Sequence, residues 1–292
     1  MAVVLGIGNA TLDIIHLVDC YPDENDEIRC HSRRLGRGGN TANTLVVLGQ
    51  LGLSCRWAGV LVDNAEGVLV ADDLTRHGID ISASERFGGG SMPVSSVIIS
   101  KQTGSRTITH FRDLPEYSFA AFSAIDLQPL DWLHFEGRNI TSVRQMLERV
   151  REISPATRCS LEIEKPRAGI ESLFPLADVL LFSKNYASTR GFADPLALLQ
   201  SVHPVCPGAD LFCTWGDAGA VALDRDGREY RHPVVAPAKV VDTLGAGDTF
   251  NAGIISGYLD ALTIEAILAR ACRLAGSKCG QPGFDGLSLY DD

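Results

Sequence analysis

The chain has 292 residues, of which 45% are hydrophobic and 21% are charged, as in an ordinary soluble globular protein that buries a substantial core. Its 26 Lys and Arg residues against 36 Asp and Glu residues give a formal net charge of −10. This acidic balance argues against nucleic acid as the main partner, because a phosphate backbone requires a basic surface.

The N-terminus and the cysteines bear on cellular location. Residues 1–6 carry no basic segment and enter a short apolar run at once, which predicts a first strand and not a signal peptide. No apolar run reaches the length that a bilayer requires, so we expect no membrane partner. The eight cysteines form no CxxC pair, which favours reduced thiols in a cytoplasmic protein. The histidines show no metal-ligand spacing, and we assign no residue to a metal.

Short apolar runs alternate with longer amphipathic segments along the chain. The expected strands are residues 3–8, 54–60, 132–136, 159–164, 179–182, 211–215 and 220–223, and the expected helices are residues 40–51, 143–152, 195–202, 250–261 and 264–278. This alternation predicts an α/β fold with a mainly parallel sheet covered by helices on both faces. Ligands of such sheets bind at the carboxyl ends of the strands.

Two regions break this alternation. Residues 14–35 and 92–110 alternate apolar and polar side chains at period two, with no helix between. Each predicts strands of a small separate sheet that lies over the pocket as a lid. A sheet of this size is marginal alone and would gain from pairing with a second copy. Without a long linker or an internal repeat, residues 1–292 are expected to form a single domain.

The first strand is followed by Asp13, which we take as a candidate ligand-binding residue. A dinucleotide fingerprint is rejected here, because Gly6 and Gly8 are followed by Thr11 where a third glycine would be required. An acid at the carboxyl end of a strand can instead accept hydrogen bonds from a polyol.

A glycine-rich loop precedes the first expected helix. Residues 36–43 read Gly-Arg-Gly-Gly-Asn-Thr-Ala-Asn. The glycines permit a close approach of backbone to ligand, and Asn40 and Asn43 fall on one face of the helix. Two carboxamides there could bind hydroxyl groups as donors and acceptors. A glycine loop with capping asparagines is the alternative that this segment alone leaves open.

Charged residues also end several expected strands. Glu136 starts the segment Glu-Gly-Arg-Asn, and Glu162 starts Glu-Ile-Glu-Lys-Pro-Arg. These charges are either ligands at the binding edge or surface ion pairs of little energetic weight. Arg106 similarly has two interpretations: a cation that binds phosphate, or a charged residue of a β-hairpin with no role in binding.

The segment 242–250, Asp-Thr-Leu-Gly-Ala-Gly-Asp-Thr-Phe, carries the strongest signal. Gly245, Ala246 and Gly247 place unhindered N–H groups at a helix start, which favours an anion. An acid beside that anion, Asp248, suggests phosphoryl transfer to a hydroxyl, with Asp248 accepting the proton. An aspartate of ordinary pKa, about 4, is a weak base. The alternative is a helix cap formed by Asp248, but a cap alone does not require both glycines.

Residues 242–251 and 36–43 together resemble the two signatures of the ribokinase-like (PfkB) sugar kinases. Within that family, residues 19–22, 27–30, 134–139, 241–251 and 278–286 are most similar to the ketohexokinase branch of fructose 1-kinases. The resemblance covers nearly the whole chain. It implies a ribokinase-like three-layer sandwich with a β-lid, and transfer of the γ-phosphate of ATP to a sugar, D-fructose giving fructose 1-phosphate.

The resemblance also implies roles for individual residues. Asp248 would be the base, and the amides of Gly245, Ala246 and Gly247 an anion hole. The sugar would contact Asp13, Asn25, Gly39, Asn40, Asn43, Arg106, Glu136 and Asp248. The nucleotide would contact Lys184, Trp215, Gly216, Gly219, Gly245, Gly247, Cys279 and Gly283. Mg2+ would arrive with ATP, K+ is a further candidate cofactor, and the lid would join two subunits.

Two departures from the family leave alternatives open. Asn25 stands where ketohexokinases carry an acid, with Asp26 adjacent, which leaves the sugar open. The segment 185–188, Asn-Tyr-Ala-Ser, keeps the Asn of the family's Asn-x-x-Glu motif and lacks its Glu. The alternatives are a kinase for another sugar, a sugar derivative or a nucleoside, such as a fructokinase giving the 6-phosphate, and a sensor without turnover.

Overall fold

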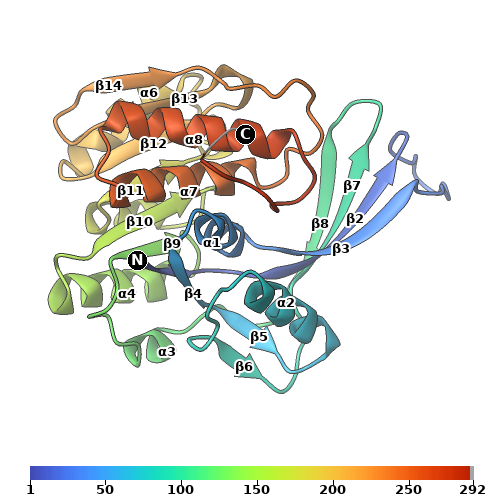
Figure 1. Cartoon of the computed structure of the whole chain (residues 1–292), viewed down its shortest axis with the longest axis horizontal. Coiled ribbons are helices and arrows are strands. Elements are labelled where there is room, and N and C mark those ends of the chain that lie inside the picture. Colours follow the sequence, from blue (N-terminus) through green and yellow to red (C-terminus); the bar gives the residue numbers. More distant parts are fainter. Residues whose placement is uncertain (290–292) are drawn as a thin grey trace.

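A computed structural model describes residues 1–289. Its main sheet has eight strands in the order β14-β13-β12-β11-β10-β9-β1-β4 (Figure 1). They are β1 (Val3–Ile7), β4 (Ser54–Ala58), β9 (Trp132–Glu136), β10 (Arg158–Ile163), β11 (Val179–Phe182), β12 (Asp210–Thr214), β13 (Ala220–Leu223) and β14 (Glu229–His232). Only the pairs β12–β13 and β13–β14 are antiparallel. The prediction of an α/β fold with a mainly parallel sheet is confirmed.

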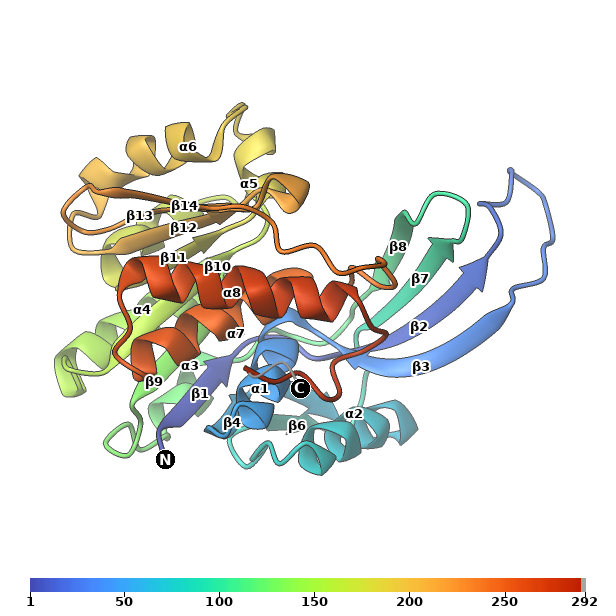
Figure 2. The same ribbon diagram turned by 45° about the horizontal axis from the view of Figure 1, so that its top comes forward.

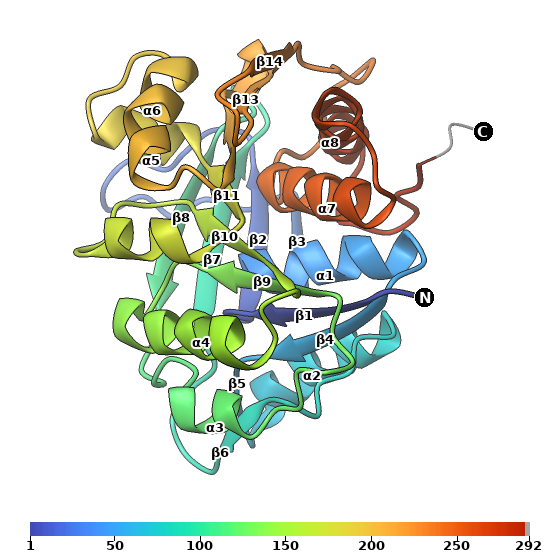
Figure 3. The same cartoon turned by 90° about the vertical axis from the view of Figure 1, so that its left-hand side faces the viewer.

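Helices cover both faces of this sheet, so three layers form (Figure 3). One face carries α1 (Asn40–Gln50), α7 (Ala246–Leu259) and α8 (Ile264–Cys279), and the other carries α4 (Ile140–Ile153), α5 (Lys184–Thr189) and α6 (Pro195–Val202). Strand β11 is wholly apolar and all four of its residues are buried, because both faces of the sheet are covered there. A Cβ on Gly6 would lie 2.6 Å from Thr41 Cγ2, so the glycine lets α1 pack directly on β1.

A small second sheet projects from this body (Figures 1 and 2). Its order is β3-β2-β7-β8, and its strands are β2 (Thr11–Val18), β3 (Ser32–Gly38), β7 (Val94–Ser100) and β8 (Arg106–Phe111). The predicted small separate sheet is therefore confirmed. Residues 19–31 form the connection between β2 and β3, because the polar run 23–27 has no apolar face to bury.

Several bounds and elements differ from the predictions. Helix α7 begins at Ala246 and not at residue 250, which places Asp248 inside its first turn. The elements without a predicted counterpart are α2 (Ala65–Arg76), α3 (Phe119–Ser123), α5, β5 (Val60–Val62), β6 (Glu85–Phe87) and β14. The start of α2 carried a readable signal, because the Asn64 side chain caps it by accepting from the N–H of Gly67.

The helices within residues 1–289 are all too short or too polar to cross a bilayer. One kinase domain over residues 1–292 remains a proposal, and residues 290–292 lie outside the described part of the chain.

Candidate active site

Polar side chains gather where β9 and β10 end, beside the starts of α1 and α7. Glu136 is the last residue of β9, and Glu162 precedes the last residue of β10. Asn40 is the first residue of α1, and its Nδ2 donates to Glu162 Oε1 at 2.9 Å. Asp248 lies in the first turn of α7 and is buried. Parallel strands thus deliver these groups to the edge where ligands of such sheets bind.

The loop before α7 presents backbone N–H groups. Gly245 has a φ of 81°, and a Cβ there would lie 2.2 Å from the Phe284 ring, so the chain requires glycine at this turn. The N–H of Ala246 donates to the carbonyl of Thr243 at 3.3 Å. Within residues 1–289, no acceptor is bonded to the N–H groups of Gly245 and Gly247. A Cβ on Gly247 would meet nothing within 4 Å, so the space beside this helix start is open.

One of the two carboxylate oxygens of Asp248 accepts a hydrogen bond from the protein. Asn43 Nδ2 donates to Asp248 Oδ2 at 2.6 Å. Burial raises the pKa of Asp248 well above its ordinary value; Glu164 and Glu136 raise it further, while the Asn43 hydrogen bond and Arg37 lower it. The expectation of an ordinary pKa is therefore wrong, because several carboxylates share this buried region.

Glu162 is a second buried carboxylate near Asp248; the sequence leaves open a ligand at the binding edge or a surface ion pair, and the burial of Glu162 excludes the surface position. Its side chain is buried, and Oε2 has no hydrogen-bond partner among residues 1–289. Burial raises the pKa of Glu162, and the Asp248, Glu136 and Glu164 carboxylates add to that rise. Asn40 Nδ2 also donates to Glu164 Oε2 at 3.2 Å. The amide group of Asn40 therefore donates to both Glu162 and Glu164.

Glu136 has protein partners for both of its oxygens. Its Oε2 accepts from the N–H of Asn9 at 2.7 Å, and its Oε1 accepts from Arg138 Nη1 at 3.4 Å. Burial raises its pKa, against the opposing effect of Arg138. The structure thus places Glu136 at the site, held in position by its neighbours.

Asp13 lies where the small sheet meets the main one. It is buried in β2, where its Oδ1 accepts from Thr11 Oγ1 at 2.7 Å and burial raises its pKa. A Cβ on Gly38 would lie 2.2 Å from Asp13 Oδ2, so a larger residue would displace the carboxylate. Gly39 has a φ of 100°, and a Cβ there would lie 2.2 Å from the Asn9 carbonyl oxygen. Two of the three glycines of the loop, Gly38 and Gly39, are therefore fixed by close contacts, whereas a Cβ on Gly36 would meet nothing within 4 Å.

The small sheet reaches the loop before α7. Arg106 Nη1 in β8 donates to Thr243 Oγ1 at 2.9 Å, and Arg34 Nη2 in β3 donates to Asp242 Oδ2 at 2.8 Å. Arg34 had no predicted role. Asn25, by contrast, is exposed in the connection between the far ends of β2 and β3 (Figure 2). Within a single chain, the structure does not bring Asn25 to Asp13 or Asp248.

The residues assigned to the nucleotide form two groups. Lys184, at the start of α5, has its Nζ 5.5 Å from the centre of the Trp215 ring, and Gly216 and Gly219 follow Trp215 in the chain. The second group lies at the end of α8, where the carbonyl of Cys279 accepts from the N–H of Val241 at 2.8 Å. Gly283 follows in the same segment, and a Cβ there would lie 3.8 Å from Arg34 Nη1.

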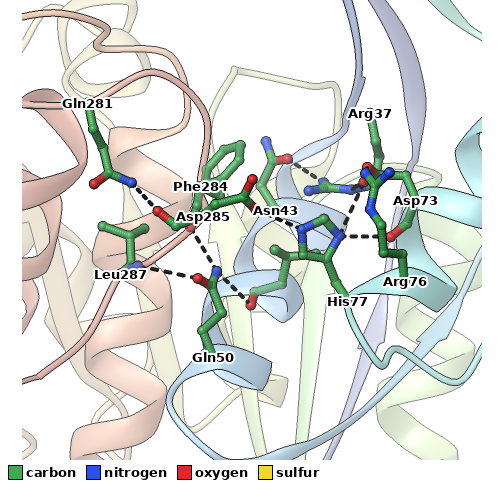
Figure 4. Close-up of polar contacts among 11 residues, drawn as sticks. Arg37, Asn43, Gln50, Asp73, Arg76, His77, Gln281, Phe284, Asp285 and Leu287 are labelled. Atoms are coloured by element: carbon green, nitrogen blue, oxygen red, sulfur yellow. Dashed lines mark hydrogen bonds and ion pairs between the residues drawn. The ribbon is translucent and has the colours of Figure 1, made fainter.

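The segment after α8 contacts Gln50 of α1 (Figure 4). The Phe284 ring lies against Gly245, and the carbonyl of Phe284 accepts from Gln50 Nε2 of α1 at 2.8 Å. Lys278 is fully buried, and its Nζ donates to the carbonyl of Asp242 at 3.0 Å. These residues were not predicted, since their partners lie far away in the sequence.

No group of three or more His, Cys, Asp or Glu residues within residues 1–289 is placed to hold a metal ion. The polar groups near Asp248 are instead suited to hydroxyl groups and to an anion, because they combine carboxylate acceptors with carboxamide and N–H donors.

Comparison with known proteins gives consistent results. The model of the pfkB family carbohydrate kinases matches residues 1–288. The chain is 38% identical to the ketohexokinase of Mus musculus over 292 residues, which covers 97% of this chain and 98% of the mouse protein.

Solved structures show the same fold. A putative ribokinase from Agrobacterium tumefaciens has a TM-score of 0.86 at 21% identity and covers 98% of this chain and 94% of its own. A ribokinase from Arabidopsis thaliana, complexed with ribose and ATP, has a TM-score of 0.79 at 20% identity, with 97% and 94% covered.

Proposed function

The chain belongs to the pfkB family of carbohydrate kinases, and on that premise we propose that it transfers the γ-phosphate of ATP to D-fructose, giving fructose 1-phosphate. The observation that carries this proposal is the position of Asp248. A buried carboxylate lies in the first turn of α7, directly beside the N–H groups of Gly245 and Gly247, which have no acceptor among residues 1–289, and the space beside Gly247 is open. The choice of sugar is supported by the similarity to the mouse ketohexokinase.

The proposed reaction uses each group for a distinct task. Asp248 accepts the proton of the sugar hydroxyl, and its raised pKa brings its basicity closer to neutral pH. The N–H groups of Gly245 and Gly247, with Ala246 in the same turn, stabilise the charge of the moving phosphoryl group. Asp13, Gly39, Asn40, Asn43 and Glu136 surround the sugar, and Arg106 reaches the phosphate from the small sheet. The phosphoryl transition state is loose, so positioning and electrostatics supply most of the rate.

The nucleotide is proposed to lie between the Trp215 region and the segment 279–283. Lys184, Gly216, Gly219, Cys279 and Gly283 belong to these two groups. Mg2+ supplies charge neutralisation on the phosphates and is proposed to be held by nucleotide oxygens and water, as its reluctance to dehydrate favours. K+ is a second cation to be tested in the same assay.

The experiment that tests the function is a coupled assay of ADP release with a panel of sugars and nucleosides. We expect D-fructose to give the largest kcat/KM, and NMR of the product to place phosphate on C1. Phosphate on C6, or a larger kcat/KM for an aminated sugar or a nucleoside, would replace the substrate assignment. ADP release with no acceptor in the panel would argue for a sensor.

The dependence of kcat on pH, on its acidic side (the acid limb), tests the raised pKa of Asp248. Turnover requires the ionised form, so kcat should rise with pH through a pKa above the ordinary value of about 4. Glu164→Gln should move this limb to lower pH, because Glu164 raises the pKa of Asp248. A wild-type limb near pH 4, measured with saturating ATP and sugar, would contradict the assignment.

We further propose a homodimer formed through the small sheet. Leu35 and Phe111 are 47% and 57% exposed, and strand register places both on the face opposite Asp13. Phe111→Lys should weaken the dimer by at least about tenfold, because a charge would be desolvated at the interface. Sedimentation velocity over a concentration series measures this, with Val205→Lys, at 55% exposure outside the small sheet, as control. A monomeric wild type would exclude the dimer.

A cytoplasmic location is part of the proposal. It is supported by the eight cysteines, which are all free thiols in the described structure.

A further inference from the structure

Arg37 is a buried arginine that has no task in the proposed reaction. Its side chain is 3% exposed and extends from β3 between α1 and α2. Arg37 Nε donates to Asp73 Oδ2 at 2.8 Å, and Arg37 Nη1 donates to Asn43 Oδ1 at 2.5 Å (Figure 4). Burying a guanidinium costs free energy of desolvation that pairing with a carboxylate often does no more than offset, so the position of Arg37 calls for a reason beyond packing.

The hydrogen bond from Arg37 fixes the orientation of the Asn43 carboxamide. A guanidinium only donates, so it must meet the oxygen of the carboxamide and not the nitrogen. The Nδ2 group of Asn43 is thereby turned toward Asp248 Oδ2, to which it donates at 2.6 Å. The other oxygen, Oδ1, accepts no hydrogen bond from residues 1–289. One oxygen of Asp248 is therefore anchored, and the second is left for a substrate proton.

Arg37 is itself held by several segments of the chain (Figure 4). Asp73 in α2 also pairs with Arg76, and its Oδ2 lies 3.6 Å from His77 Nδ1. His77 Nε2 lies 3.0 Å from Asp285 Oδ1, which ties α2 to the segment after α8. The Phe284 ring of that segment lies 5.7 Å from Arg37 Cζ. The guanidinium is thus fixed before any ligand binds.

We propose that Arg37 is a positioning residue, which acts through Asn43 to hold the Asp248 carboxylate in its reactive orientation. This inference rests on the proposed role of Asp248 as the base. Arg37 touches neither the sugar nor the nucleotide in this proposal. The alternative is a purely structural arginine, whose loss would lower stability without changing the titration of Asp248.

The test compares Arg37→Gln and Arg37→Lys with the wild type. Arg37→Gln should lower kcat about 10- to 100-fold, since small misplacements of catalytic groups have effects of this size. The KM for the sugar should stay within about twofold, because only an interaction of the transition state is lost. Arg37→Lys keeps the positive charge but lacks the planar guanidinium that hydrogen-bonds Asp73 and Asn43 at the same time. Its kcat should therefore lie between those of Arg37→Gln and the wild type. Arg56→Gln, which breaks the ion pair with Asp80 away from the site, is the control and should keep the wild-type kcat.

A second readout is the pKa of the Asp248 carboxyl group, measured by 13C NMR and assigned with Asp248→Asn. The charged groups that face Asp248 are Glu136 from β9, Glu162 and Glu164 from β10 and the residues after it, and Arg37 from β3. Arg37→Gln removes the only cation in this set and should raise the pKa, which also moves the acid limb of kcat upward.

The possible outcomes separate the two proposals. A wild type that phosphorylates no acceptor overturns the proposed function, while the NMR titration still decides on Arg37. An unchanged kcat and an unchanged Asp248 pKa in both Arg37 variants would overturn the positioning role, as would a raised KM at constant kcat. If Arg37→Gln does not fold, Arg37→Lys, with its buried charge still present beside Asp73, tests the positioning role through kcat alone, and a wild-type kcat in this variant would overturn it.

Discussion

Asp248→Asn is expected to lower kcat by about 10³-fold, within the range measured for removal of a general base, while the Kd of the sugar changes by less than about threefold. Asparagine keeps the shape of the side chain and can still accept from Asn43 Nδ2, but it cannot accept the hydroxyl proton. A coupled assay of ADP release measures kcat, and calorimetric titration with sugar in the absence of ATP measures Kd. A kcat near that of the wild type would exclude the base assignment.

Stability measurements separate this chemical effect from misfolding. Because burial raises the pKa of Asp248, the folded protein binds this proton more tightly than the unfolded chain does. The contribution of Asp248 to stability is therefore largest below the unfolded pKa and is lost as pH rises through the folded one. Asp248→Asn should accordingly not lower Tm at pH 8.

Asp260→Asn is the matched control. Asp260 lies at the other end of α7, where it pairs with Arg270 at 2.5 Å and is 53% exposed. An exposed ion pair contributes little to stability, so Tm and kcat should both stay near the wild-type values. Comparable losses of kcat in the two variants would point to a general effect on α7.

The turn before α7 could be predicted from sequence because its determinants are local, although the expected helix began four residues too late, at residue 250. Gly245 is required by its φ of 81°, and α7 begins at the next residue. The small sheet was predicted for the same reason, since alternation at period two is a property of each strand by itself. The order of the strands in the sheets could not be predicted from sequence, because it depends on contacts between segments that are distant in the chain.

Partners distant in the chain explain what the sequence did not predict. Arg37 and Asp73 are separated by 36 residues, and Arg34 and Asp242 by 208. A charged residue carries no local signal of which opposite charge it will meet. The raised pKa of Asp248 has the same origin, since it depends on burial and on Glu136, which comes from another strand.

Gly247→Val should lower kcat by about 10²- to 10³-fold, the size of effect known for impairing one donor of an anion hole, because the side chain would keep the phosphoryl group away from the N–H, with little change in the Kd of the sugar. The N–H of Gly247 has no acceptor among residues 1–289, and a Cβ there meets nothing within 4 Å. A branched side chain would therefore enter the open space where the phosphoryl group is proposed to pass. The same kcat and Kd measurements apply, supplemented by the KM for ATP.

Gly245 is a poorer test of the same idea. Any side chain there would meet the Phe284 ring and require a φ of 81°, so its effects on folding and on catalysis would be mixed. Gly88→Val is the better control, since Gly88 also has open space around it and lies outside the site. If Gly247→Val raises the Kd of the sugar as strongly as it lowers kcat, the N–H groups do not form an anion hole, and the glycines before Asp248 serve only to start α7.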